Sequence, residues 1–331
     1  MNFAAPAAVR NQARAAMLAI RSDETVEVEP YSLTTTSMGG RFVVHVDPSG
    51  HAEEAARACR MAVSRVDRWA SRLTRHSDTS DLMRLNADPA AAVPVRPILA
   101  AALAAGLSAT EASEGFADIT LLDARLRAEG IAPAETTSRP GEWKLVRRRR
   151  GAAIVRRPPG LSFDLGGVGK GWIADRTLNL LARWRSAVVD ADGDLAVQCA
   201  PGSHWDVAIE DPRYEGSNLA VLRLAATPRN GSTRWGVATS GTSIHRWNVN
   251  GAATHHLIDP RTRLPAATDV VQATVVAGSA LRAEALAKAA VIAGSVQGFA
   301  LLERAGVRGA VLLTTDGRTL ALPVTLSLLA E

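Results

Sequence analysis

The chain has 331 residues, of which 47% are hydrophobic and 21% charged, so it can form a sizeable packed core and wholesale disorder is excluded. The formal net charge of +5 rests mainly on arginine, because lysine occurs only at positions 144, 170 and 288. Aromatic residues make up 4% of the chain, which leaves few platforms on which bases could stack. We therefore do not expect a nucleic acid as a partner.

The two cysteines, Cys59 and Cys199, are far apart in the sequence and share no metal-ligand spacing, so they indicate neither a disulfide framework nor a zinc site. No run of about 18 apolar residues occurs and no convincing cleavage site follows the N-terminus, so we expect a cytoplasmic protein without membrane insertion. Residues 1–30 are Ala-rich and then charged. We expect them to form a loosely held arm ahead of a single domain at 31–331.

Helical and strand patterns alternate irregularly after this arm. Residues 41–46 predict a strand, which is followed by a turn and by apolar residues at helical spacing up to Leu73. Two short apolar runs flank the arginines at 147–150 and predict a hairpin with a solvated basic turn. The other predicted elements are helices at 98–113, 171–184, 279–293 and 296–306, strands at 187–190, 205–209 and 219–224, and a closing hairpin around Asp316-Gly317. This irregular order predicts an α+β fold, with two intimately packed lobes of antiparallel or mixed sheets and flanking helices around a central site.

A glycine-rich run that leads from a strand end into a helix is the sharpest local feature. It reads Phe163-Asp-Leu-Gly-Gly-Val-Gly-Lys-Gly-Trp-Ile-Ala-Asp-Arg176. Its glycines allow close approach to the backbone, the helix start offers free N–H groups, and Lys170 adds a positive charge. The run is neither a Walker A loop nor a G-x-G-x-x-G fingerprint, because Gly171 follows the lysine and Trp172 takes the third glycine position. We interpret it as a phosphate or pyrophosphate site; by itself it leaves a purely structural turn open.

Shorter motifs accompany this loop between about residues 34 and 294. Before it come Ser37-Met38-Gly39, the run from Ser77 to Asn86 (Ser-Asp-Thr-Ser-Asp-Leu-Met-Arg-Leu-Asn), and Gly115-Phe-Ala-Asp118-Ile-Thr120. After it come Asp192-Gly-Asp194, Thr239-Ser240-Gly241 and His255-His256-Leu-Ile-Asp259-Pro260-Arg-Thr262. Together and in this order, the motifs resemble those of the FAD:protein FMN transferase (ApbE) family. Departures from the family pattern include Gly40 in place of Thr and Arg263 in place of Gly.

The resemblance implies an α+β fold around a central flavin-nucleotide site. It also implies an enzyme that moves the FMN half of FAD onto a Thr or Ser hydroxyl of an acceptor protein and releases AMP. The expected partner is therefore a flavin-accepting protein with a Thr/Ser acceptor motif. The residues expected to bind FAD are Met38, Gly39, Asp118, Thr120, Gly167, Gly169, Lys170, Asp194, Ser240 and Gly241.

The resemblance further implies a Mg²⁺ ion, held by an Asp and a Thr of a helical A-D-A-L-A-T motif and by a main-chain carbonyl of the glycine loop. The corresponding stretch here is Ala283-Glu-Ala-Leu-Ala-Lys288. Glu284 and Gly169 are therefore the candidate metal ligands. Lys288 replaces the usual Thr ligand, and an ammonium group has no lone pair to offer a metal. We expect FAD binding with weakened or absent Mg²⁺ dependence, whereas the residues alone would suggest an ordinary i,i+4 ion pair.

His256 is the candidate catalytic residue, as a general base or as a group that orients the acceptor hydroxyl, because an imidazole pKa of about 6.5 suits proton removal at neutral pH. A buried histidine bonded to Asp259 is the structural alternative. The altered metal motif keeps two other functions open. One is hydrolysis of FAD to FMN and AMP, and the other is non-catalytic carriage or sensing of FAD.

Overall fold

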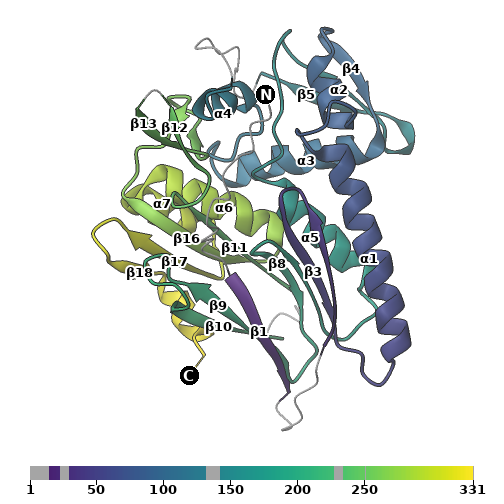
Figure 1. Cartoon of the computed structure of the whole chain (residues 1–331), viewed down its shortest axis with the longest axis vertical. Coiled ribbons are helices and arrows are strands. Elements are labelled where there is room, and N and C mark those ends of the chain that lie inside the picture. The colour runs from purple at the N-terminus through teal and green to yellow at the C-terminus, as the bar shows by residue number, and fades with distance from the viewer. Residues whose placement is uncertain (1–14, 23–29, 132–141, 227–233, 250, 331) are drawn as a thin grey trace, which may run out of the picture.

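The computed structural model describes residues 15–22, 30–131, 142–226, 234–249 and 251–330. Its centre is an eight-stranded sheet in the order β18-β17-β16-β11-β8-β7-β3-β2, with antiparallel pairing throughout (Figure 1). Its strands are β2 (Tyr31–Ser37), β3 (Gly40–Val46), β7 (Ala187–Ala191), β8 (Asp194–Gln198), β11 (Arg234–Gly241), β16 (Val270–Ala277), β17 (Gly309–Thr314) and β18 (Thr319–Ala321). Neighbouring strands are joined partly by hairpins and partly by helices, as the predicted α+β class requires.

A smaller sheet packs against one face of the central sheet. It has the order β1-β9-β10 and consists of β1 (Ala15–Ser22), β9 (Ser203–Glu210) and β10 (Asn218–Ala225). Every residue of β7 and β8 is buried, as expected for strands covered on both faces. The two sheets share one apolar cluster, which includes Val188, Leu195, Val197, Trp205, Val207, Ile209, Leu222, Leu224 and Val237.

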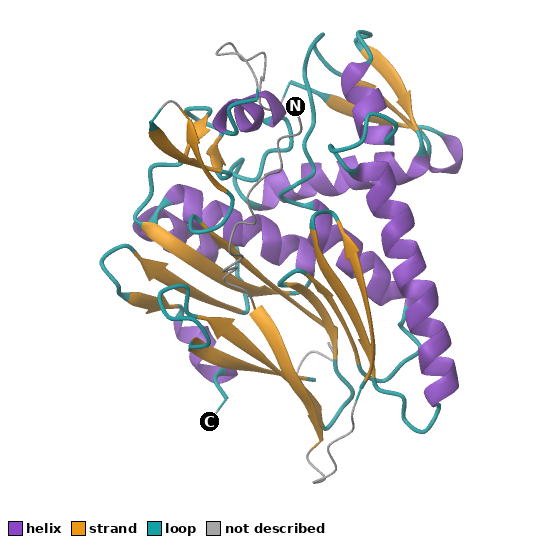
Figure 2. Ribbon diagram, viewed as in Figure 1, coloured by secondary structure: helices purple, strands orange, loops and turns teal. Residues whose placement is uncertain are grey.

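Helices cover the other face of the central sheet (Figure 2). They are α1 (Ala52–Leu73), α5 (Gly169–Leu180), α6 (Ala280–Ala293) and α7 (Ser295–Arg304), and α3 (Pro97–Ala112) packs against α1, α5 and α6. Helix α6 packs on β11 and β16, and α5 packs on β7 and β8. The Asp175 carboxylate of α5 accepts hydrogen bonds from Ala280 N at 2.9 Å and Leu281 N at 3.0 Å. Because these N–H groups have no partner within their own helix, the contact fixes the start of α6 against α5.

Short elements lie beyond one end of this helical layer, with α4 and the β12–β13 hairpin on one side and α2 with β4 and β5 on the other (Figure 1). They are α2 (Asp81–Ala87), β4 (Ala92–Val95), α4 (Leu122–Ala128), β5 (Lys144–Arg147), β6 (Ala153–Arg156), β12 (Arg246–Val249), β13 (Ala252–His255), β14 (Ile258–Asp259) and β15 (Leu264–Pro265), with a 3₁₀ turn at Arg149–Gly151. A second 3₁₀ turn, Pro323–Leu328, packs near the C-terminus against β17 and β10. The predicted hairpin with a basic turn is confirmed: β5 pairs with β6, and the four arginines at 147–150 are exposed.

The α+β prediction is confirmed, and the structure differs from the sequence expectation at the N-terminus. Instead of a loosely held arm, residues 15–22 form β1, which pairs along its length with β9. Residues 1–14 and 23–29 of the expected arm lie outside the described residues. The assignment of 31–331 as a single domain stays a prediction. No helix in the described part of the chain is long and apolar enough to cross a membrane.

Candidate functional site

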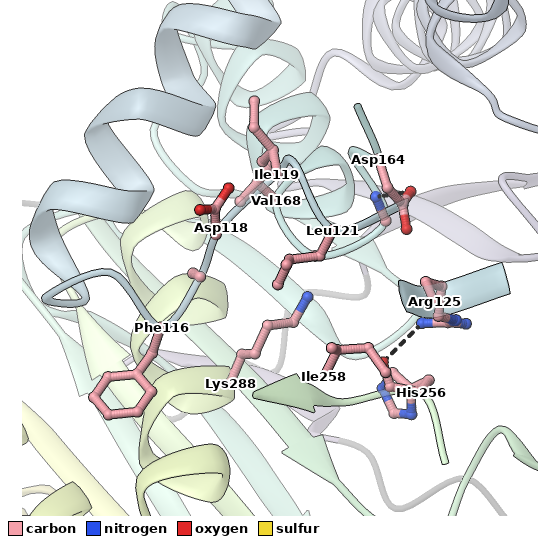
Figure 3. Close-up of a pocket in the computed structure, with 13 residues that line it drawn as sticks. Phe116, Asp118, Ile119, Leu121, Arg125, Asp164, Val168, His256, Ile258 and Lys288 are labelled. Atoms are coloured by element: carbon pink, nitrogen blue, oxygen red, sulfur yellow. Dashed lines mark hydrogen bonds between the residues drawn. The ribbon is translucent and has the colours of Figure 1, made fainter. Parts of the chain in front are cut away.

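A pocket opens where the glycine-rich loop, α6 and the segment that joins α3 to α4 meet (Figure 3). Stretches far apart in the sequence contribute to it. The lining residues are Phe116, Ala117, Asp118, Ile119, Leu121, Arg125, Asp164, Gly166, Gly167, Val168, His256, Ile258 and Lys288. The fold thus brings together three of the predicted site residues, Asp118, Gly167 and His256, with Lys288, which the sequence placed at the position of a metal ligand.

The glycine-rich loop is held by side chains on both sides of it. The Asn86 amide donates to Phe163 O and accepts from Phe163 N, each at 2.8 Å, which fixes the segment that enters the loop. Asp164 Oδ1 accepts from Gly166 N at 2.8 Å. A side chain at Gly167 would overlap Lys288 Nζ, so the loop presents bare backbone to this ammonium group.

Two charged residues of α6, Glu284 and Lys288, face the glycine-rich loop. Glu284 is 4% exposed, and its Oε2 accepts a hydrogen bond from Gly171 N at 2.9 Å. Burial raises the pKa of Glu284 to about 8; the Asp194 carboxylate acts in the same direction, and the nearby ammonium groups oppose it. Burial also lowers the pKa of Lys288, although Glu284 favours its charged form. Among the described residues no ion pair joins Glu284 to Lys288, so the simple i,i+4 pair is not what the geometry shows.

Lys170 is the lysine that the sequence pattern placed beside the phosphates. In the structure its Nζ forms an ion pair with Asp194 Oδ2 at 3.2 Å. Burial opposes the charge, but Asp194 and Glu284 outweigh it, so the pKa of Lys170 is raised. Burial raises the pKa of Asp194 against the effect of Lys170. Neither residue is among those that line the described pocket, whereas Lys288 is. Their expected contact with FAD stays a prediction.

His256 lies between β13 and β14 and forms one wall of the pocket (Figure 3). Its Nδ1 is buried and has no hydrogen-bond partner in the described part of the chain. Burial, and then the Arg125 guanidinium, lowers the pKa of His256 well below its usual value, so the ring is neutral near pH 7. The structural alternative was a His256 ring bonded to Asp259, and no such bond is found among the described residues. The Asp259 carboxylate instead accepts a hydrogen bond from Arg261, with Nη2 and Oδ2 2.8 Å apart.

Arg125 of α4 is a pocket residue that the sequence analysis missed. Its Nη1 donates to the carbonyl oxygen of His256 at 3.1 Å, and its Nε lies 2.5 Å from Glu129 Oε1. Glu129 also pairs with Arg75 at 2.7 Å, and the Arg125 guanidinium lies 5.2 Å from the centre of the Trp247 ring. No motif marks Arg125. The i,i+4 spacing to Glu129 was its one signal, and it is an ordinary feature of helices.

The turn between β2 and β3 carries Met38 and Gly39, with φ of 52° and 76°. Met38 reaches the start of α5, because a Cβ placed on Gly169 would lie 3.0 Å from Met38 Cε. Thr120 is buried, and its N and Oγ1 both lie 2.7 Å from Asp118 Oδ1. Burial raises the pKa of Asp118, and these hydrogen bonds counteract part of the rise. They also fix the orientation of the carboxylate.

Ser240 and Gly241 end β11 and pair with Ala273 and Gln272 of β16. A Cβ at Gly241 would lie 2.9 Å from Val271 O, so a close backbone approach explains this glycine. Neither residue is among those that line the described pocket. Their expected contact with FAD stays a prediction.

A family model described as "ApbE family" matches residues 38–312 of this chain. The matched region includes the glycine-rich loop, every residue that lines the pocket and most of the central sheet. The chain belongs to the ApbE family.

Curated relatives of this ApbE-family chain are named FAD:protein FMN transferase. The Treponema pallidum protein is 33% identical over 174 residues, which cover 49% of this chain and 46% of the relative. The Salmonella typhimurium protein is 30% identical over 154 residues, which cover 45% of this chain and 42% of the relative. The chain therefore aligns with less than half the length of these two relatives.

Solved ApbE structures share the fold. The apo form of the flavinyl transferase ApbE from Pseudomonas stutzeri superposes with a TM-score of 0.75 at 22% identity, over 92% of this chain and 98% of that one. The ApbE protein of Thermotoga maritima gives a TM-score of 0.77 at 20% identity, over 92% and 100% of the two chains. At these identities the likeness shows the fold.

The implied Mg²⁺ ion does not fit the groups that face the glycine-rich loop. Glu284 Oε2 is engaged by Gly171 N, and Lys288 puts a cation where the family's second side-chain oxygen is expected. A divalent ion prefers several oxygen ligands, and an ammonium group beside the loop would repel it. Within the described ranges, no group of three or more His, Cys, Asp or Glu residues is arranged to hold a metal.

Proposed function

We propose that this ApbE-family chain binds FAD in the pocket, transfers FMN to a Thr or Ser hydroxyl of an acceptor protein, and releases AMP. One observation carries the proposal: the family match spans a pocket in which a lysine ammonium adjoins bare glycine backbone beside a neutral histidine. Glycine backbone and an ammonium group are suited to a phosphate, and a neutral imidazole is suited to a hydroxyl.

We assign the phosphate-binding role in the pocket to its glycine-rich loop and to Lys288. Phosphoryl transfer needs little more than positioned reactants and positive charge on the phosphate oxygens. The loop at Gly167 and the Lys288 ammonium supply the phosphate side. The acceptor hydroxyl approaches the phosphorus of the FMN half, forms the new P–O bond, and AMP departs with the electron pair of the bond that breaks.

His256 accepts the hydrogen bond of that hydroxyl and takes its proton as the new bond forms. Burial and the Arg125 guanidinium hold the pKa of His256 well below the value of about 6.5 that we assumed from the sequence, so the ring is free to accept a hydrogen bond at neutral pH but is a weaker base than expected. The ring therefore orients the hydroxyl and passes its proton on to solvent.

The test uses the purified chain, FAD, and a protein fragment that carries a [Ser/Thr]-Gly-Ala-[Ser/Thr] motif. The proposal predicts AMP release together with covalent flavin fluorescence on the fragment. AMP with free FMN would mean FAD hydrolysis, and bound intact FAD without AMP would mean a carrier or sensor; either result contradicts transfer. The cytoplasmic location and the Thr/Ser motif of the acceptor protein stay predictions.

A further inference from the structure

Lys288 of α6 places its ammonium group in the pocket, next to the glycine-rich loop. Among the described residues its Nζ makes no hydrogen bond and no ion pair within 4.0 Å. It points at the glycine-rich loop, close enough to Gly167 to exclude a side chain there (Figure 3). A charged group in a largely buried place is costly unless something compensates it, so this geometry calls for an anion in the pocket.

Arg125 brings a second cation to the same pocket from α4. Its Nε and Nη1 are engaged by Glu129 and by the His256 carbonyl, while its Nη2 makes no hydrogen bond with the described residues. Glu129 is shared with Arg75, so this three-residue group keeps a net positive charge. The side chain is 15% exposed, and the Trp247 ring supports its guanidinium. The group is thus held in one orientation before any ligand arrives.

Glu129 pairs with Arg125, but the other described carboxylates around the pocket bond to groups other than Lys288. Asp118 bonds to Thr120, Asp164 bonds to Gly166 N, and Glu284 bonds to Gly171 N. Asp194, which lies behind the loop, pairs with Lys170. Within the described ranges, therefore, no carboxylate lies within 4.0 Å of Lys288 Nζ as an ion-pair partner.

We propose that Lys288 and Arg125 bind the diphosphate of the nucleotide directly, so that this ApbE-family chain recognises FAD without a divalent cation. This inference rests on the proposed function, because it concerns the same ligand. A fixed ammonium and a guanidinium each donate charge-assisted hydrogen bonds to phosphate oxygens. Lys288 thereby takes over the neutralisation that a metal ion supplies in a site with oxygen ligands.

The experiment titrates FAD into the ligand-free full chain and follows quenching of flavin fluorescence, once with EDTA and once with Mg²⁺. We expect dissociation constants that agree within about twofold, because no metal is part of the site. Lys288→Met should weaken binding in EDTA by about tenfold or more, as expected for a lost charge-assisted contact, and Arg125→Met should weaken it in the same direction. Lys144→Met, at an exposed position of β5, is the matched lysine control and should bind like the wild type.

The inference would be overturned if Mg²⁺ tightened FAD binding to the wild type by about tenfold or more. It would also be overturned if Lys288→Met bound FAD in EDTA as tightly as Lys144→Met does. Thermal unfolding of each variant shows whether it is folded, and the EDTA comparison on the wild type needs no variant. Binding of ADP, measured by calorimetry in EDTA, tests the diphosphate contacts without the flavin. FAD binding in EDTA without AMP release or label on an acceptor would uphold this inference while the proposed transfer fails. FAD binding that needs Mg²⁺ and is followed by transfer would overturn this inference while the proposed function holds.

The converse variant combines Lys288→Thr with Glu284→Asp, which removes the ammonium and offers two oxygen ligands. We expect its FAD binding in EDTA to be weaker than that of the wild type and to be restored in part by Mg²⁺. A variant whose binding shows no response to Mg²⁺, and equals the wild type in EDTA, would contradict a role for Lys288 in place of the metal.

Discussion

The role assigned to the buried side chain of Glu284 differs between the sequence and the structure. The sequence marks it as a candidate metal ligand, since it takes the place of an Asp in the family's helical motif. In the structure its carboxylate ties α6 to the first turn of α5 through Gly171 N at 2.9 Å. Burial raises the pKa of this carboxyl group to about 8. Its role here is to join two helices beside the pocket.

This role predicts the behaviour of two substitutions at the same position. Glu284→Gln keeps an oxygen that can accept from Gly171 N, so FAD affinity in EDTA should stay within about twofold of the wild type. Glu284→Ala leaves that buried N–H without a partner and should lower the free energy of unfolding by about 1–3 kcal/mol. Urea unfolding and FAD titration measure the two effects. If Glu284→Gln loses FAD binding while it keeps its stability, the carboxylate has a ligand role that this account denies.

At the level of elements, the site depends on how the glycine-rich loop meets α6. The sequence predicted the loop, its strand-to-helix geometry and the helix at 279–293, and it placed both Lys170 and Lys288 near the phosphates. It could not show that Lys288 lines the pocket and that Lys170 does not. Lys170 sits in the loop itself, yet it pairs with Asp194 at the start of β8. Lys288 is more than 100 residues further on, and only the packing of α6 on the sheet brings it to Gly167.

The contact between loop and helix can be tested by a double substitution. Gly167 has no left-handed backbone torsion, so Gly167→Ala should cost stability mainly through overlap with Lys288 Nζ, by about 1–3 kcal/mol. In a Lys288→Ala background the added methyl group has room and should cost much less. Gly278→Ala is the matched control, because its Cβ would meet Arg308 Nη2 at an ordinary 3.4 Å. Equal costs of Gly167→Ala in both backgrounds, measured by urea unfolding, would show that the two residues are not in contact.

For the whole molecule, local patterns were enough to predict the fold class and the order of most elements. They predicted the β5–β6 hairpin because two apolar runs flank a basic turn, and they predicted α3 because an apolar, Ala-rich run is closed by Glu114-Gly115. They did not predict that β1, β9 and β10 form a second sheet. That sheet depends on pairing between β1 and β9, which are separated by about 180 residues, and no local period records such a pairing.

Local sequence patterns also revealed only part of the candidate site. Motif residues such as Asp118, Gly167 and His256 were found from the sequence because short patterns carry them, and the pocket brings them together. Arg125 belongs to no motif, and its position depends on α4 packing beside β13, where Thr254 Oγ1 bonds to Ala128 O at 2.7 Å. The charge state of Lys170 and the neutral ring of His256 likewise follow from burial and neighbouring charges. The spacing of residues along the chain does not predict these two charge states.

The central claim is that this pocket recognises the linked phosphates of a flavin dinucleotide. Its most direct test is calorimetric titration of ligand-free protein with FAD and, in parallel, with riboflavin, which has the flavin ring but no phosphate. The account predicts saturable binding of one FAD per chain and riboflavin binding weaker by about tenfold or more, because the contacts of the glycine-rich loop and Lys288 are lost. Equal affinity for the two compounds, or no heat with FAD, would contradict it.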